Sequence, residues 1–139
     1  MDIAGGEQFD VIVVGAGNAA TCAALSARES GARVLMLEIA PEEARGGNSC
    51  FTGGAFRVVY HGFDDLARLI PDISDHELSN VDVGTYTEEQ YFDDMGRMTE
   101  YRCDPDLTEI LIRRSFETAV WMRENGVRFQ LGLLSLIHI

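Results

Sequence analysis

Positive charge is scarce in this sequence. The chain has 11 basic residues against 23 acidic ones, which gives a formal net charge of -12 at pH 7. A surface of this sign repels the phosphates of nucleic acids and the headgroups of anionic membranes. We therefore expect no nucleic acid and no anionic membrane surface among the partners of this protein.

Closely spaced cysteines, paired histidines and long apolar runs are also missing. Cys22, Cys50 and Cys103 lie far apart without a CxxC pair, so neither a disulfide framework nor a zinc site is expected. His61 and His76 have no partner at ligand-like spacing, and we expect both at the surface rather than on a metal. No apolar run approaches the ~20 residues of a membrane span, and the first residues are acidic where a signal peptide is basic. We expect a cytoplasmic protein without direct membrane insertion.

What is present is the composition of a globular domain, with 46% hydrophobic and 24% charged residues, and a clear pattern near the start. Phe9 to Val14 is a short β-branched run, typical of a strand in a parallel sheet that is covered on both faces. We expect a helix from Thr21 to Ser30, ended by Gly31 in the left-handed conformation, and a second strand from Val34 to Leu37. This order predicts an α/β, Rossmann-like unit.

A glycine-rich turn joins the first strand to the helix, with the sequence Gly15-Ala16-Gly17-Asn18-Ala19-Ala20. In a GxGxxA turn the first glycine permits the sharp bend, and the second lets the backbone approach a pyrophosphate. The final alanine keeps the helix close to the sheet. The helix amino terminus would face the phosphates, where its free N–H groups favour negative charge. The turn therefore favours a dinucleotide ligand.

An acidic residue, Glu38, follows the second strand. At that position a carboxylate accepts hydrogen bonds from the ribose hydroxyls of a dinucleotide, and it repels the 2′-phosphate of NADP. The alternative is a tight turn without a ligand and a solvated Glu38. The order of a strand, a helix and a second strand that ends at an acidic residue favours the dinucleotide. It does not distinguish FAD from NAD.

A second glycine-rich stretch begins eight residues after Glu38 and reads Gly46-Gly47-Asn48-Ser49-Cys50-Phe51-Thr52-Gly53-Gly54. An NAD-binding unit usually turns promptly into another helix, whereas here two Gly-Gly pairs bracket an Asn-Ser. Such a stretch is typical of backbone held against a flat or extended ligand. An ordinary flexible loop is the alternative that composition leaves open.

The two glycine motifs together with Glu38 resemble those of the flavoprotein family of fumarate reductases and succinate dehydrogenases. Within that family, three segments look most like FAD-dependent tricarballylate dehydrogenases: Gly46 to Tyr60, Tyr86 to Phe92 and Cys103 to Leu107. The resemblance covers roughly Phe9 to Phe129. It implies a Rossmann-like FAD-binding domain with a parallel sheet, truncated before a substrate-capping domain is complete.

The resemblance also implies a set of cofactor contacts. The FAD pyrophosphate would be wrapped by the first motif and the ribose held by Glu38, while the second motif would line the pyrophosphate, ribityl and flavin-ring region. The implied residues are Gly15, Ala16, Gly17, Asn18, Ala19, Glu38, Gly46, Gly47, Asn48, Ser49, Thr52, Gly53 and Gly54. Membrane-bound succinate dehydrogenases carry a histidine in the second motif that bonds covalently to the flavin. No histidine occurs between Ala40 and Tyr60, so we expect FAD to be held non-covalently.

The activity that the resemblance implies is hydride transfer between flavin N5 and a carbon beside the carboxylate of a small di- or tricarboxylate, with an unidentified electron acceptor. The family's substrate-clamping arginines and histidine lie downstream of this stretch. We therefore assign no catalytic residue here and expect the fragment alone to be inactive. An NAD-dependent dehydrogenase domain and a non-catalytic nucleotide-binding fragment are the alternatives.

The remaining sequence predicts three helices. A short one falls within 64–80 and ends at Pro71; a second runs from Glu88 to Tyr101 after Thr87 as N-cap; a third follows Asp104 and runs to about Asn125. The third helix is expected to bury a stripe made of Ile112, Phe116, Ala119 and Val120.

Charged residues of these helices have a simple interpretation. We expect the acidic cluster from Glu88 to Asp94 to be a solvated helix face, and Arg97, Arg102, Arg113 and Arg114 to pair with neighbouring acids.

The domain organisation follows from the extent of the resemblance. Residues 1–129 are expected to form the amino-terminal part of an FAD-binding domain that enters the capping domain near its end. Residues 130–139 do not continue the resemblance, and we expect a non-native tail from about Leu133.

Overall fold

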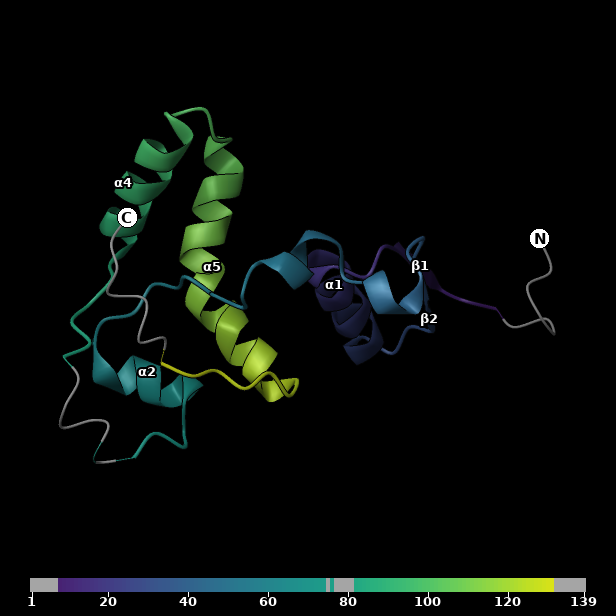
Figure 1. Cartoon of the computed structure of the whole chain (residues 1–139), viewed down its shortest axis with the longest axis horizontal. Helices are drawn as coiled ribbons and strands as arrows, with labels where there is room; N and C mark the ends of the chain where they lie inside the picture. The colour runs from purple at the N-terminus through teal and green to yellow at the C-terminus, as the bar shows by residue number, and fades with distance from the viewer. Residues whose placement is uncertain (1–7, 75, 77–81, 132–139) are drawn as a thin grey trace. The chain divides into compact units, whose positions relative to one another are not determined.

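A computed structural model describes residues 8–74, 76 and 82–131 of the chain. The chain divides into two compact units, residues 1–55 and residues 56–139, which are described separately below (Figure 1). Within the described part of the chain, no helix has the length and apolar character needed to cross a membrane.

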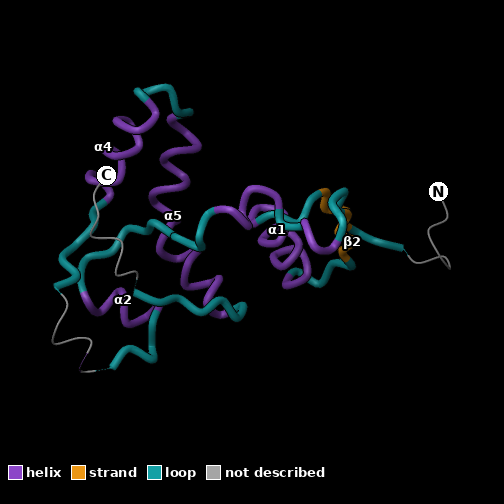
Figure 2. Tube along the Cα trace, viewed as in Figure 1, coloured by secondary structure: helices purple, strands orange, loops and turns teal. Residues whose placement is uncertain are grey.

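The first unit is a βαβ unit. Strand β1 (Val11–Val14) leads into helix α1 (Asn18–Glu29), which returns to strand β2 (Val34–Leu37). The strands pair in parallel with Val11 opposite Val34, and Figure 2 shows both strands beside α1. The predicted α/β order is therefore confirmed for this unit.

Both β1 and α1 start at other residues than the sequence predicts. Strand β1 starts at Val11 rather than Phe9, because pairing with β2 begins with Val11 opposite Val34. The Val11 N–H donates to the carbonyl of Arg33 as the first bond of the ladder, and the Asp10 N–H donates to the same carbonyl. The Asp10 carboxylate also forms an ion pair with the Arg33 guanidinium. Helix α1 starts at Asn18 rather than Thr21, directly after Gly17 in an extended conformation.

The sheet of the first unit is covered on one side. Val13 of β1 and Ala24 of α1 are buried, whereas Ile12 is 58% exposed and Val14 is 82% exposed. Because successive strand residues point to opposite faces, the face that carries Ile12 and Val14 is left open. The predicted cover on both faces is therefore absent among the described residues.

The second unit consists of three described helices. Helix α2 (Phe63–Leu69) packs on α5 (Pro105–Glu124), and α4 (Glu88–Thr99) packs along α5 as well (Figure 1). An antiparallel bridge joins Tyr60 to Tyr86 ahead of α4. The predicted short helix before Pro71 is thus confirmed as α2.

Two apolar clusters hold these helices together. The buried members are Val59, Tyr91 and Ile112 in one cluster and Leu69, Ala119 and Val120 in the other. The predicted stripe on α5 is confirmed, with Phe116 half-buried beside the second cluster.

The buried hydroxyl of Ser115 on α5 forms a hydrogen bond to the backbone of the segment before α2. Ser115 Oγ accepts a hydrogen bond of 2.9 Å from the Val59 N–H and donates one to the Ile112 carbonyl. This pairing satisfies a backbone donor that burial would otherwise leave without a partner.

The caps of the two long helices explain where they start. Thr87 accepts from the Gln90 N–H while the Gln90 side chain accepts from the Thr87 N–H, a complete capping box. Asp104 Oδ1 accepts from the Leu107 N–H at 3.0 Å and precedes Pro105, so both predicted N-caps are confirmed.

Helix α4 ends at Thr99, two residues before the predicted Tyr101. Glu100 and Tyr101 both adopt left-handed backbone, with φ of 53° and 58°. The Tyr101 N–H donates to the Gly96 carbonyl and the Glu100 N–H to the Arg97 carbonyl, which is a Schellman ending. The Tyr101 ring lies on Gly96, where an added Cβ would come within 2.7 Å of the ring. This packing explains a glycine inside α4.

Candidate cofactor site

The glycine-rich turn of the first unit lies between β1 and α1. Gly15 has a φ of 107°, which favours glycine, and its N–H donates to the Leu37 carbonyl at 2.6 Å. Gly17 precedes α1 and provides no side chain to cap it. The first N–H groups of a helix have no acceptor within the helix, so this end of α1 attracts negative charge.

One of those N–H groups is bound by the second glycine motif. The Asn18 N–H donates to Ser49 Oγ at 3.0 Å, across 31 positions of sequence. A hydroxyl has one proton to donate in addition to its lone pairs. Ser49 therefore accepts from the helix and still has its own proton to give to a ligand.

The second motif is a 3₁₀ helix, η2 (Gly47–Phe51), with left-handed glycines on both sides. Gly46 has a φ of 109°. A Cβ added to Gly17 would lie 3.5 Å from both the Gly46 carbonyl oxygen and Ser49 Oγ. The two glycine motifs are thus in contact, which the flexible-loop alternative does not predict.

Glu38 lies directly after β2, at the carboxyl end of the sheet. Its Oε1 accepts a hydrogen bond of 2.9 Å from the Ala40 N–H. That N–H, followed by those of Ile39 and Ala16, lowers the pKa of the exposed Glu38 carboxyl. Since Ala16 belongs to the glycine-rich turn, the ionised carboxylate lies at the same edge of the sheet as the turn.

At the carboxyl-terminal end of the second motif, hydrogen bonds join residues that are close in the sequence. Thr52 Oγ1 donates to the Ser49 carbonyl at 3.0 Å and accepts from the Gly54 N–H at 3.3 Å. Asn48, Gly53 and Gly54 are exposed. Among the described residues, no hydrogen bond joins Thr52, Gly53 or Gly54 to the first motif, so their predicted role near the flavin stays a prediction.

This donor set suits a dinucleotide pyrophosphate. The helix end offers N–H groups, Ser49 offers a hydroxyl proton, and Gly17 leaves its side-chain position empty. An ionised Glu38 at the same edge supplies an acceptor for ribose hydroxyls. Sequence reasoning identified these residues one by one but gave no signal that Ser49 contacts Asn18.

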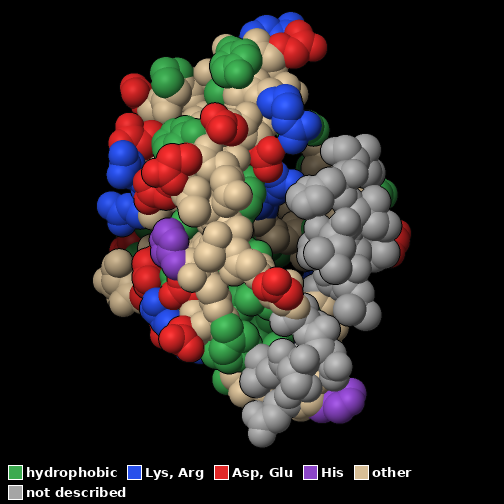
Figure 3. Space-filling model, turned by 90° about the vertical axis from the view of Figure 1, so that its left-hand side faces the viewer, with side chains coloured by type: hydrophobic (Ala, Val, Ile, Leu, Met, Phe, Trp, Pro, Cys, Tyr) green, Lys and Arg blue, Asp and Glu red, His purple; other side chains and the backbone are tan. Residues whose placement is uncertain are grey.

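Charged residues of the second unit follow the expected pairing in most cases. Arg97, Arg102 and Arg113 form ion pairs with Asp94, Glu100 and Glu109. Arg114 has no ion pair within the described part of the chain. On the face shown in Figure 3, acidic and basic side chains are interspersed rather than gathered by sign.

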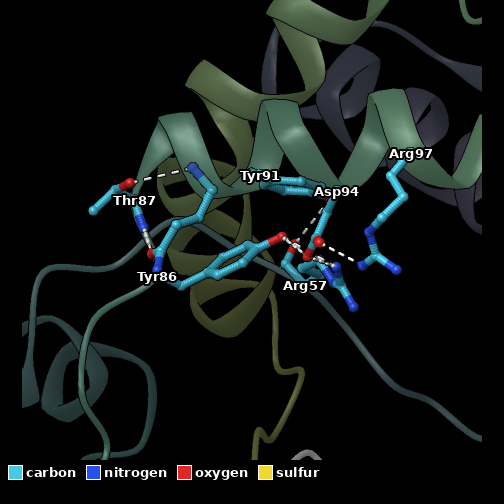
Figure 4. A network of polar contacts seen from close by, with 7 residues as sticks. Arg57, Tyr86, Thr87, Tyr91, Asp94 and Arg97 are labelled. Carbon is cyan, nitrogen blue, oxygen red and sulfur yellow. Dashed lines mark hydrogen bonds and ion pairs between the residues drawn. The ribbon is translucent and has the colours of Figure 1, made fainter. Parts of the chain in front are cut away.

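The acidic cluster at 88–94 is not simply a solvated face, and this prediction was wrong for Asp94. Its side chain is only 26% exposed and accepts from Arg57, Tyr86 and Arg97 (Figure 4). Glu89 and Asp93 are exposed as predicted.

His61 and His76 are exposed, as expected. No group of three or more His, Cys, Asp or Glu side chains suited to a metal ion occurs in the described ranges.

The fold and the site define a dinucleotide-binding βαβ unit, and comparison with known proteins identifies the dinucleotide. Residues 10–136 match the family model of the FAD binding domain. The chain belongs to this family, which decides between FAD and NAD in favour of FAD. The match overlaps residues 130–139, and the expectation of a non-native tail there stays a prediction.

Curated relatives are reductases. The chain is 32% identical over 130 residues to the vinyl phenol reductase of Lactiplantibacillus plantarum, covering 94% of this chain and 23% of the relative. It is 30% identical over 120 residues to a fumarate reductase (cytochrome) of Shewanella frigidimarina, covering 86% and 18%. It is 29% identical over 117 residues to the urocanate reductase of Eggerthella lenta, covering 84% and 16%. The chain thus spans about a fifth of the length of these relatives.

Proposed function

We propose that this chain is the FAD-binding part of an oxidoreductase of the fumarate reductase type. The observation that carries the proposal is the contact between the two glycine motifs, in which Ser49 Oγ accepts a hydrogen bond from the Asn18 N–H at the start of α1. When bound, FAD would supply hydride transfer. The family relationship and the reductase names of the relatives support this activity.

Each part of the site has a separate task in this proposal. The N–H groups at the start of α1 and the Ser49 hydroxyl bind the pyrophosphate, and the backbone at Gly17 allows its close approach. Glu38 accepts the ribose hydroxyl protons. Asn48, Thr52, Gly53 and Gly54 line the ribityl and flavin end, as the resemblance implies. No residue of this chain is given a proton-transfer role.

The proposed substrate is a small di- or tricarboxylate such as tricarballylate. Relatives named for fumarate and urocanate support a small carboxylate. Other relatives of this chain are named for vinyl phenol and digoxin, so similarity in this part of the chain does not depend on one substrate. Substrate choice therefore belongs to parts of the whole protein beyond the cofactor motifs.

A non-catalytic nucleotide-binding fragment is the second candidate. All of the proposed cofactor residues lie between residues 15 and 54, and none of them is given a catalytic role. This favours a chain that binds FAD without turnover. The two candidates share the FAD site and differ only in turnover.

The test of the cofactor site is Glu38→Ala in the full-length protein. Removing the ribose acceptor should weaken FAD binding by about 5- to 100-fold, measured by titrating apoprotein with FAD. Glu43→Ala is the matched control, because Glu43 is an exposed acid of the same unit, in the 3₁₀ helix η1 (Glu42–Ala44), and should leave affinity unchanged. Equal affinity of Glu38→Ala and the parent protein would refute the assignment.

Non-covalent attachment is a separate part of the proposal. The segment from Ala40 to Tyr60 has no histidine to link to the flavin. Acid precipitation of the full-length holoprotein should therefore release all of the flavin into the supernatant. Flavin retained in the pellet would show a covalent link through another residue.

A further inference from the structure

A cluster of charged residues in the second unit lies outside the cofactor motifs. Arg57 Nη1 donates to Asp94 Oδ2 at 2.5 Å, and Arg97 Nη2 donates to Asp94 Oδ1 at 2.8 Å. The two guanidinium groups are therefore held on the two oxygens of a single carboxylate. Figure 4 shows them beside Asp94, with the Tyr86 hydroxyl pointing toward both Asp94 and Arg57.

The cluster has an excess of positive charge. Two guanidinium groups and one carboxylate leave one positive charge, and Arg57 and Arg97 are the charged groups that act on Asp94. Tyr86 adds no negative charge at neutral pH, because burial and its hydrogen bond to Asp94 raise its pKa to about 12.

The guanidinium groups still have donors to offer. Arg57 uses only Nη1, for Asp94 and for Tyr86 Oη at 3.0 Å, and Arg97 uses only Nη2. Their other nitrogens have no hydrogen-bond acceptor among the residues that the structure describes. Both side chains are more than half exposed, at 55% and 64%. A guanidinium edge matches the two oxygens of a carboxylate or phosphate.

The arrangement is also fixed in advance of binding. Asp94 lies on α4, where it is half-buried, and Tyr86 Oη donates to it at 2.8 Å. Tyr86 packs against the first apolar cluster, with its ring centroid 5.3 Å from that of Tyr91. Fixing a guanidinium in this way reduces the side-chain entropy that binding would otherwise cost.

We propose that Arg57 and Arg97, bridged by Asp94, form a binding site for a small oxyanion, either a carboxylate or a phosphate group. The site needs neither FAD nor the proposed reductase activity. Affinity should be in the millimolar range, because the arginines are half exposed and one of their two charges is already paired.

The test uses the complete 139-residue chain, labelled with ¹⁵N and free of FAD. Inorganic phosphate and succinate are titrated in separate samples at constant ionic strength set with sodium chloride. We expect the Nε–H signals of Arg57 and Arg97 to shift and saturate with at least one of the two anions. Saturation with phosphate alone identifies a phosphate site, and saturation with succinate alone identifies a carboxylate site.

Variants decide whether the arginines cause the binding. Arg97→Gln should weaken it by about fivefold or more, whereas Arg97→Lys keeps the charge, loses the planar fork and should give a smaller loss. Arg102→Gln is the control, since among the described residues Arg102 forms an ion pair with Glu100 alone, and both side chains are 76% exposed. The amide signals of α4 report whether each variant stays folded.

Three results would overturn the proposal. Shifts that rise linearly without saturation for both anions, or that are equally large with added chloride, would mean ionic screening at a purely structural ion pair. Unchanged binding in both folded Arg97 variants would also exclude the site. None of these results bears on FAD binding, because FAD is absent from the experiment.

Discussion

Asp94 was expected on a solvated helix face, but it is half-buried and accepts hydrogen bonds from Arg57, Tyr86 and Arg97. Arg97 first, then Tyr86, and Arg57 as well, lower its pKa from the ordinary value of 3.8. The ionised form is therefore favoured more in the folded chain than in the unfolded one. This carboxylate stabilises the fold above its unfolded pKa, and the contribution disappears as the pH falls through the lower, folded pKa.

This sign leads to a pH prediction. The parent chain should lose thermal stability relative to Asp94→Asn as the pH is lowered below 3.8, the ordinary aspartate value, because the variant has no carboxylate to protonate there. Asp93→Asn is the control at the exposed neighbouring position. Thermal unfolding followed by circular dichroism over a series of pH values measures the difference. A constant difference between parent and Asp94→Asn across that range would contradict the assignment.

Residues with purely local tasks could be predicted from the sequence. The positive φ of Gly15 and the position of Glu38 after β2 depend on neighbours within a few positions. The Ser49 contact with Asn18 joins residues 31 apart, and Arg57 meets Asp94 across 37 positions. No periodicity or propensity encodes such contacts, since they depend on how separate elements pack.

At the scale of elements, helix propensity does not predict where α4 ends. Glu100 and Tyr101 are ordinary helix-compatible residues, so the sequence predicts a longer helix. The Tyr101 ring packs on Gly96 and the two residues take left-handed backbone. The existence and caps of α4 and α5 were predictable because Thr87, Gln90 and Asp104 are local signals; the end was not, because it depends on tertiary packing.

The left-handed backbone at Glu100 gives a stability prediction. Such a conformation costs a non-glycine residue about 1 kcal/mol or more, so Glu100→Gly should stabilise the chain by about 0.5 to 1 kcal/mol. Urea unfolding measures the change.

A glycine in the middle of a helix provides the comparison. Arg114→Gly, at an exposed position of α5, should destabilise by about 0.8 kcal/mol because it only adds backbone entropy to the unfolded chain. If Glu100→Gly destabilises the chain by as much as Arg114→Gly does, the left-handed turn contributes no strain.

At the scale of the whole molecule, the chain spans about a fifth of the length of its relatives. Hydride transfer requires a substrate carbon held close to the flavin, and such positioning supplies about 7 to 11 kcal/mol of the barrier. Residues 1–139 alone, with FAD in excess, should therefore give no turnover.

The assay for this prediction follows oxidation of tricarballylate or succinate and reduction of fumarate with artificial electron carriers. Free FAD at the same concentration sets the background. Turnover clearly above that background would place catalytic groups in this chain, with Arg57, Arg97 and Arg102 as the first residues to substitute.

The open face of the sheet has a consequence for how the chain behaves in solution. Ile12 and Val14 present apolar surface, while the net charge of -12 keeps copies of the chain apart. Salt shortens the reach of that repulsion from about 30 Å at 0.01 M to about 8 Å at 0.15 M, without weakening the attraction between apolar faces. We therefore expect ionic strength to set the colloidal stability of the isolated chain, which should stay dispersed in dilute buffer and self-associate through the open face of the sheet as salt is added.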